Sequence, residues 1–178
     1  MIEVREATPA DGTVIGEIHA ASWQAAYAPF FDAEFATREV ASRRTRWHPR
    51  VGTGHLLLAA VDTRPLAFTY AVPSETRPGS AEIYSFYAHP AAWGSGVAKV
   101  LMDGLLATLR ADKYSHVHLW TLRDTPQSLR FYTKCGFTKT GATHPRDFGD
   151  GNPLPQIEFE RPTNNQDTTA PTPQHNRL

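Results

Sequence analysis

The sequence has little cysteine, and its other metal-binding residues are not grouped. Cys135 is the single cysteine among 178 residues. One thiol can form neither an intramolecular disulfide nor a cysteine-based zinc site, and it is typical of a reducing compartment. The histidines are scattered without metal-ligand spacing. We therefore expect no structural disulfide, no bound metal and a cytoplasmic location.

The chain also lacks an excess of charge of either sign and a long apolar run. Eighteen Lys and Arg residues balance eighteen Asp and Glu residues, so no overall field attracts nucleic acid or an anionic membrane. The first residues, Met1 to Arg5, do not have the layout of a signal peptide, and no apolar run approaches the length of a membrane span. We expect no nucleic-acid partner and no membrane partner.

Length and composition predict one folded domain followed by a polar tail. The 178 residues are 40% hydrophobic, an ordinary content for a globular domain. From residue 163 onward the chain has almost no apolar residues, so it cannot bury enough surface to order itself. We expect the domain to span residues 1–162 and the tail, residues 163–178, to be disordered.

Apolar periodicity predicts an α/β (α+β) domain. Helical spacing begins near residues 9, 32, 97 and 126. Strand patterns occur at residues 2–6, 55–61, 66–72, 81–88, 117–122, 137–140 and 155–160. The run His55 to Val61 is continuously apolar, as expected of a central strand covered on both faces.

A glycine-containing turn joins one of these strands to a helix. Gly94 and Gly96 precede the helical segment that starts at Val97, and such a turn can direct several N–H groups toward one phosphate. The two best-known phosphate motifs are absent, because no Gly-Lys-Ser/Thr follows and Lys99 stands where a third glycine would be. A tight connection with no ligand remains an equal alternative on this pattern alone.

Two helices carry side chains that suggest either packing or binding. His19, Trp23 and Tyr27 form one stripe on the first helix, where an aromatic pair at the edge of the core is as reasonable as a functional role. The second helix is rich in arginine, including Arg43 and Arg46. We favour a solvated arginine face over a site for an anionic ligand.

Two stretches resemble the GNAT N-acetyltransferase superfamily. Residues 88–98 are similar to the family's acetyl-CoA pyrophosphate motif, and residues 128–137, with Phe-Tyr and Gly-Phe at the expected spacing, to its second motif. The resemblance implies a GNAT-type acyl-CoA N-acyltransferase fold: a central, mixed, mostly antiparallel twisted sheet of six to seven strands flanked by four helices. Trp93, Ala88 and Thr125 depart from the residues usual in the family, and Thr125 in place of Asn predicts weaker cofactor contact.

The same resemblance assigns residues to acetyl-CoA. In the family, the strand before the loop exposes backbone to the pantetheine arm, and the loop and helix start hold the pyrophosphate. The residues implied in cofactor binding are Phe86, Tyr87, Ala88, Trp93, Gly94, Ser95, Gly96, Val97, Ala98, Lys99, Thr125 and Ser128.

Two side chains match catalytic positions of the family. Tyr132 matches the general acid that protonates the sulfur of coenzyme A, although a purely structural aromatic is the alternative. Glu82 matches a strand glutamate that serves as the base, and strict alternation would place it on one face with Tyr84, Phe86 and Ala88. An exposed glutamate, with water as the base, carries nearly equal weight.

The acceptor is the least constrained part of the prediction. Trp23, Tyr27, Tyr70 and Tyr84 are expected as an aromatic wall suited to an apolar or cationic amine. Asp147 and Asp150 could add an acidic rim, although loop carboxylates are more often simply solvated. We expect acetyl transfer to the primary amine of a small molecule, as in detoxification or antibiotic resistance, with a homodimer as one assembly. Alternatives are a protein or peptide acceptor, and a non-catalytic acyl-CoA-binding regulatory module.

Overall fold

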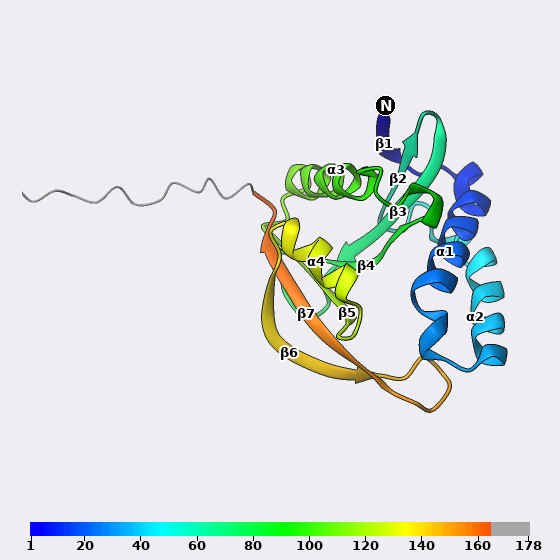
Figure 1. The fold of residues 1–178 in the computed structure, drawn as a ribbon. Helices are drawn as coiled ribbons and strands as arrows, with labels where there is room; N and C mark the ends of the chain where they lie inside the picture. The colour runs from blue at the N-terminus through cyan, green and yellow to red at the C-terminus, as the bar shows by residue number, and fades with distance from the viewer. Residues whose placement is uncertain (165–178) are drawn as a thin grey trace, which may run out of the picture.

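The computed structural model describes residues 1–164, and the remaining tail residues, whose disorder the composition predicts, lie outside the described part. The strands are β1 (Ile2–Glu6), β2 (His55–Val61), β3 (Arg64–Pro73), β4 (Ser80–Ala88), β5 (His116–Leu122), β6 (Thr138–Arg146) and β7 (Leu154–Pro162). The α-helices are α1 (Gly12–Ala26), α2 (Ala33–Thr45), α3 (Val97–Ala111) and α4 (Pro126–Lys134). Figure 1 shows their arrangement.

The seven strands form one mixed sheet in the order β1-β2-β3-β4-β5-β7-β6. Within the described residues, β4 and β5 run parallel and every other neighbouring pair is antiparallel. A parallel pair needs a crossover, and α3 supplies it between β4 and β5. The predicted fold class, strand number and helix number are confirmed.

Helices cover both faces of the sheet (Figure 1). Helices α3 and α4 pack on one face, and α1 and α2 on the other. Strand β2 lies between these layers: Leu57 and Ala59 join the core under α3, whereas Leu56 and Leu58 join the core under α1. The continuous apolar run of β2 is therefore explained by burial on both sides, as its sequence predicts.

Strands β4 and β5 separate halfway along their length. Their parallel pairing ends at Ile83 and Leu119, while β4 stays paired with β3 as far as Ala88. The register between β3 and β4 also shifts where Tyr70 faces Ser85 and Ala71 faces Ile83, which leaves Tyr84 as an extra residue in β4. Beyond Ile83, one edge of β4 is thus left without a partner strand in the described chain.

The extra residue at Tyr84 changes which β4 side chains share a face. Before it, Ile83 belongs to the core under α3, and after it Phe86 and Ala88 pack against that same core. A β-bulge inverts the alternation of the residues that follow it. The prediction that Glu82 shares a face with Phe86 and Ala88 is therefore wrong, because it assumed strict alternation.

The end of the domain differs from the sequence prediction in two places. Strand β6 extends to Arg146, well beyond the predicted residue 140; its side chains are almost all exposed, so no apolar alternation marks them. Thr163, assigned to the tail, is buried: its N–H donates to the carbonyl of Ser115 at 3.0 Å, and its hydroxyl donates to that of Tyr114 at 2.7 Å. The described structure thus continues past the expected boundary at residue 162.

A buried histidine joins α1 to the segment after α2. The indole nitrogen of Trp47 donates to Nδ1 of His19 at 2.9 Å, and the rings of Phe68 and Tyr87 also contact His19. Burial, with the nearby cations Arg43, Arg46 and Arg50, lowers the pKa of His19 from 6.5 to about 2. The imidazole is therefore neutral in the folded protein over the working pH range.

This shift predicts acid sensitivity. Because the unfolded chain binds a proton at His19 near pH 6.5 and the folded chain does not, stability is lost as pH falls between about 6.5 and about 2. From pH 6 to pH 4 we expect His19 to lower the free energy of unfolding by about 1.4 kcal/mol per pH unit. His19→Gln should remove this slope in urea titrations, whereas His116→Gln, at an exposed position, should keep it. Equal slopes in the wild type and His19→Gln would contradict the argument.

Candidate functional site

The main cleft, of about 670 Å³, opens where β4 and β5 separate. Its walls come from the end of β4, the loop before α3, the first turn of α3, α4 and the last turns of α1. Helix α4 packs on one face of the sheet and α1 on the other. One cleft can reach both layers because the two strands no longer close the sheet between them.

The glycine turn forms one end of the cleft. Gly94 and Gly96 have φ angles of 81° and 86°, which favour glycine, and Gly96 is the N-cap of α3. A Cβ built on either glycine would meet nothing within 4 Å, so the space in front of the turn is open. The first N–H groups of α3 have no partner within the helix, and with the helix dipole they favour an anion at this point.

Trp93 closes the loop onto the strand. Its indole nitrogen donates to the carbonyl of Ala88 at 3.0 Å, and the hydroxyl of Ser22 donates to the same carbonyl at 3.1 Å. Trp93 also lines the cleft. The residue that departs from the usual polar side chain therefore fixes the path of the loop.

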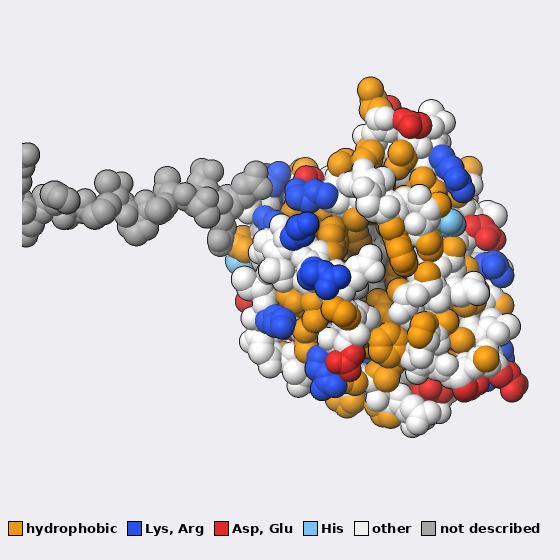
Figure 2. Space-filling view, in the orientation of Figure 1, with side chains coloured by type: hydrophobic (Ala, Val, Ile, Leu, Met, Phe, Trp, Pro, Cys, Tyr) orange, Lys and Arg blue, Asp and Glu red, His pale blue; other side chains and the backbone are white. Residues whose placement is uncertain are grey.

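Three cations border the same end of the cleft. Lys99 lies on α3, where it pairs with Asp103, and Arg130 and Lys134 lie on α4. Lys and Arg side chains gather along one side of the hollow in Figure 2. The sequence prediction missed Arg130 and Lys134. Their spacing of four residues on one helix, on either side of Tyr132, was the available signal.

Ten of the twelve predicted cofactor residues line the cleft, and Ser95 and Thr125 do not. Ser95 Oγ instead accepts from the N–H of Val97 at 3.3 Å, which caps the start of α3. The hydroxyl of Thr125 donates to the carbonyl of Leu122 at 2.7 Å and is buried under the start of α4. Both side chains serve the turns that begin helices. Other lining residues that the prediction missed are Ser22, Ala26, Ala92, Gln127, Phe131 and Cys135.

Tyr132 lies in the wall of the cleft. Its ring packs among Phe86, Phe131, Phe137 and Phe159, and it is 8% exposed. Burial raises the pKa of its hydroxyl well above the usual value. The phenol is therefore protonated at neutral pH and can donate a proton or a hydrogen bond.

Cys135 lines the same part of the cleft. Burial raises the pKa of its thiol to about 11. Since the thiolate is the reactive form, this cysteine is a poor nucleophile at neutral pH.

Glu82 is outside the cleft lining, at the point where β4 and β5 separate. Glu82 pairs with His118 in the parallel ladder, one pair before the ladder ends at Ile83 and Leu119. Its side chain is half-buried. Burial, with Glu158 and Glu75 nearby, raises the pKa of its carboxyl above the usual value. The carboxyl is thus more basic than an exposed glutamate, as a proton acceptor near neutral pH requires.

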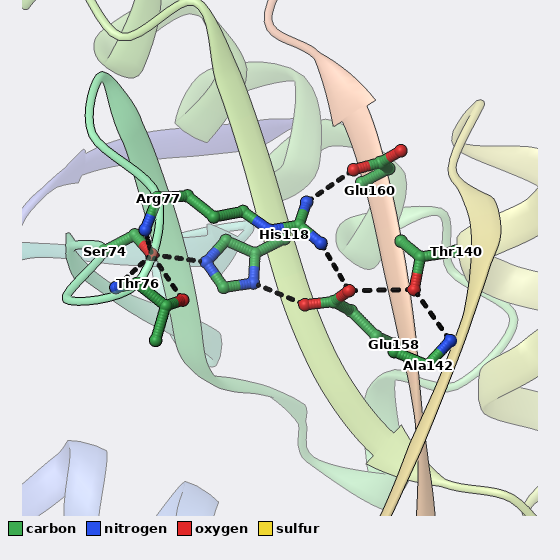
Figure 3. A network of polar contacts seen from close by, with 8 residues as sticks. All are labelled: Ser74, Thr76, Arg77, His118, Thr140, Ala142, Glu158 and Glu160. Carbon is green, nitrogen blue, oxygen red and sulfur yellow. Dashed lines mark hydrogen bonds and ion pairs between the residues drawn. The ribbon is translucent and has the colours of Figure 1, made fainter.

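A polar network holds the strand opposite Glu82 (Figure 3). His118 Nδ1 lies 3.1 Å from the carboxylate of Glu158, and its Nε2 lies 2.7 Å from Ser74 Oγ. Glu158 also pairs with Arg77, which in turn binds Glu160. The backbone N–H of Arg77 donates to Ser74 Oγ at 3.2 Å. The network therefore ties the β3–β4 loop to β5 and β7 at the base of the split.

The four predicted acceptor-side aromatics do not form one wall. Tyr27 lines the cleft, and its ring contacts Tyr87 edge to face at 6.2 Å. Trp23 is buried and stacks on Phe31. Tyr70 is buried, with its hydroxyl 2.8 Å from Thr53 Oγ1, and Tyr84 is exposed on the bulge. Trp23 and Tyr70 are core residues, because their large aromatic rings pack among the buried residues next to α1 and α2.

Within residues 1–164 we find neither a metal-binding group of side chains nor a membrane-spanning helix. No group of three or more His, Cys, Asp or Glu side chains there is placed to hold a metal ion. Over the same residues, no helix combines the length and the apolar character needed to cross a bilayer.

A family model and solved structures match the chain. The model of the acetyltransferase (GNAT) family matches residues 15–137. A search among curated proteins gives no significant match. PaiA N-acetyltransferase from Thermoplasma acidophilum, crystallised with coenzyme A, has a TM-score of 0.72 at 18% identity, over 91% of this chain and 99% of that chain.

Two further structures share the fold over nearly their whole length. Ribosomal-protein-alanine N-acetyltransferase from Brucella melitensis has a TM-score of 0.66 at 20% identity, over 90% of this chain and 99% of that chain. The protein yncA from Salmonella typhimurium, solved with acetyl-CoA, has a TM-score of 0.66 at 20% identity, over 97% of this chain and 99% of that chain. At these identities the likeness shows the fold.

The network of Figure 3 gives a stability prediction with a matched control. Glu158 is 4% exposed, so Glu158→Gln leaves Arg77 and His118 without a buried carboxylate, and we expect a loss of about 3 kcal/mol in the free energy of unfolding. The side chain of Glu160 is 42% exposed, and Glu160→Gln should cost under about 1 kcal/mol. Urea titration of both variants checks this, and equal losses would mean that burial does not decide the cost.

Proposed function

Because the chain belongs to the GNAT acetyltransferase family, we propose that it is an acetyl-CoA-dependent N-acetyltransferase that acetylates the primary amine of a small molecule. The observation that carries the proposal is a single cleft with an open glycine turn at one end, an unpaired strand edge along its length and a protonated tyrosine in its wall. These three parts match the three sections of acetyl-CoA: its phosphates, its amide-containing arm and its thioester.

The residues present fit such a ligand. The backbone at Gly94 to Lys99, with the cations Lys99, Arg130 and Lys134, would hold the phosphates. The free edge of β4 between Tyr84 and Ala88 would hydrogen-bond the arm as a neighbouring strand would. When bound, acetyl-CoA supplies an activated acetyl group on sulfur.

Tyr132 is proposed as the general acid. Its raised pKa keeps the proton on the hydroxyl at neutral pH, so the phenol can donate a hydrogen bond or a proton to the sulfur as negative charge develops there. The thiol of Cys135 lines the same part of the cleft and is also protonated at neutral pH. A backbone N–H of β4, between Phe86 and Ala88, would stabilise the negative charge on the carbonyl oxygen.

Glu82 is proposed as the base that accepts the proton of the amine. Since it lies outside the cleft lining, the proton would reach it through water, and solvent alone is the competing base. Its raised pKa and its place at the start of the strand split support the assignment. The contact between His118 and Glu158 would hold β5 in place beside Glu82.

A small acceptor is favoured over a protein because the β6–β7 loop packs against the helices. Phe148 contacts Phe31 edge to face at 5.4 Å, and Gly149 approaches Phe35. An extended peptide needs an open groove, whereas these contacts bring the β6–β7 loop against Phe31 and Phe35. Two of the structural neighbours are named for acetylating ribosomal proteins, so peptides belong in the test.

The test is loss of the acetyl-CoA thioester with a panel of small amines and peptides, together with direct titration of acetyl-CoA binding. We expect turnover with at least one small amine. Tyr132→Phe should lower kcat about 100-fold and leave the Kd of acetyl-CoA within about 3-fold, because the hydroxyl acts in the transition state.

Tyr70→Phe is the matched control, since its hydroxyl binds Thr53 away from the cleft. Full activity in Tyr132→Phe would exclude it as the acid. Acetyl-CoA binding without turnover of any amine would favour a non-catalytic binding module, and turnover of peptides alone would favour a protein acceptor.

The pH profile tests Glu82. A carboxylate base works in its deprotonated form, so the wild-type rate should fall as pH drops through the raised pKa of Glu82. Glu82→Gln should lower kcat about 100-fold near pH 7, and the deficit should shrink as pH rises and the amine loses its proton to water. Glu6→Gln, at an exposed position at the end of β1, is the control. An unchanged profile in Glu82→Gln would leave water as the base.

A further inference from the structure

Two tyrosine rings meet in the wall of the cleft beside α1. Tyr27, the C-cap of that helix, and Tyr87, near the end of β4, both line the cleft. Their rings are in edge-to-face contact, with 6.2 Å between the centroids. The contact therefore joins α1 to the strand whose free edge is proposed to bind the arm of acetyl-CoA.

Tyr87 is supported by the core on the side away from the cleft. The centroid of its ring lies 4.5 Å from that of His19 and 5.8 Å from that of Phe68, and the side chain packs against the buried cluster next to α1. His19 is itself held by the indole nitrogen of Trp47 at 2.9 Å. Because close-packed interiors do not yield to extra volume, Tyr87 forms a rigid part of the wall.

Tyr27 lies at the end of its helix and is only partly buried. Its N–H donates to the carbonyl of Trp23 at 2.8 Å, and the two rings are 6.2 Å apart between centroids. The ring of Tyr27 thus lies between Trp23 and Tyr87 and contributes to the surface of the cleft. A smaller side chain at this position would enlarge the cleft without emptying the centre of the core.

The other residues of α1 that line the cleft are small. Ser22 and Ala26 are one helical turn apart on the face that borders the cleft. The hydroxyl of Ser22 donates to the carbonyl of Ala88 at 3.1 Å, so this face of the helix lies close to β4. On the α1 side, the bulk that limits the cleft therefore comes from Tyr27.

These rings lie in the same part of the cleft as Tyr132, the proposed acid. Phe86, the neighbour of Tyr87 on β4, contacts the ring of Tyr132 with 6.5 Å between centroids. Burial, with the phenols of Tyr87 and Tyr132, also raises the pKa of Tyr27, as expected for hydroxyls that are close together. Tyrosines from α1, β4 and α4 thus surround one region of the cleft.

An acid that protonates the sulfur of coenzyme A must lie next to the thioester, so the acyl group would lie in this region. We propose that Tyr27 selects the acyl donor: its ring, held against Tyr87, leaves room for acetyl and excludes longer acyl chains. This inference rests on the proposed function and adds the residue that limits the size of the transferred group. The ring acts by its volume, so no step of the transfer changes.

The test is direct titration of binding, without an acceptor, using free coenzyme A, acetyl-CoA, butyryl-CoA and hexanoyl-CoA. In the wild type, the Kd should rise with chain length, and that of hexanoyl-CoA should exceed that of acetyl-CoA about 10-fold or more, because a closed pocket rejects added methylenes. Tyr27→Ala vacates the volume of a ring, and each methylene that enters an apolar space tightens binding about 4-fold.

In Tyr27→Ala the ratio of the Kd of hexanoyl-CoA to that of acetyl-CoA should therefore fall about 10-fold or more. The Kd of free coenzyme A, which has no acyl group, should stay unchanged. A purely structural role of Tyr27 would weaken all four ligands alike. Thermal melts check folding, and Tyr27→Leu, which keeps an apolar side chain beside Trp23, gives the same comparison if Tyr27→Ala does not fold.

Two further variants separate the volume of the ring from other effects. Tyr27→Phe keeps the ring and should keep the wild-type ratio, so that the hydroxyl is excluded as the cause. Phe30→Ala is the matched control, because Phe30 is an exposed aromatic close to Tyr27 in sequence that does not line the cleft. It should also keep the wild-type ratio.

Three results would overturn the inference and leave the proposed function standing. The first is a wild type that binds hexanoyl-CoA as tightly as acetyl-CoA, and the second is an unchanged ratio in the folded Tyr27→Ala or Tyr27→Leu variant. The third is an equal fall of the ratio in Tyr27→Phe or Phe30→Ala. A wild type that binds neither acetyl-CoA nor coenzyme A would overturn both the inference and the proposed function.

Discussion

The separation of β4 from β5 beyond Ile83 and Leu119 is the constraint on which the rest of the site depends. Backbone N–H and C=O groups need partners, and a parallel ladder that stops halfway leaves one edge of β4 free to bind a ligand as a strand would. The first turn of helix α3 lines the same cleft, and the first N–H groups of a helix have no partner within it. The polar network of Glu158 and His118 secures the paired half of the ladder below the split.

The charges are arranged in regions that match this geometry. Cations on α3 and α4 border the cleft, and on α2 the guanidinium of Arg43 is buried against the ring of Trp23. The lining also contains aromatic rings, with Tyr132 and Cys135 both held protonated by burial. A net charge of zero for the whole chain therefore conceals a local positive region beside the cleft.

Local sequence predicted the part of the site that is built from consecutive residues. Gly94 and Gly96 line the cleft because the turn, its φ angles and the helix start all depend on neighbours along the chain. Thr125 and Ser95 do not line the cleft, and their hydroxyls bond to nearby backbone groups, which a motif does not show. Arg130 and Lys134 were missed because the sequence shows a helix face but not what lies opposite it.

The sequence by itself determined the succession of strands and helices along the chain, the burial of β2 on both faces and the glycine turn before α3, since these follow from short-range periodicity and backbone preference. Only the tertiary structure decided the bulge at Tyr84, which moved Glu82 to the other face, and the burial of Arg43 against Trp23. It also decided that Arg146 meets α2 through Phe148 and Phe31. Those features depend on register and on contacts between distant segments, and neither leaves a local pattern in the chain.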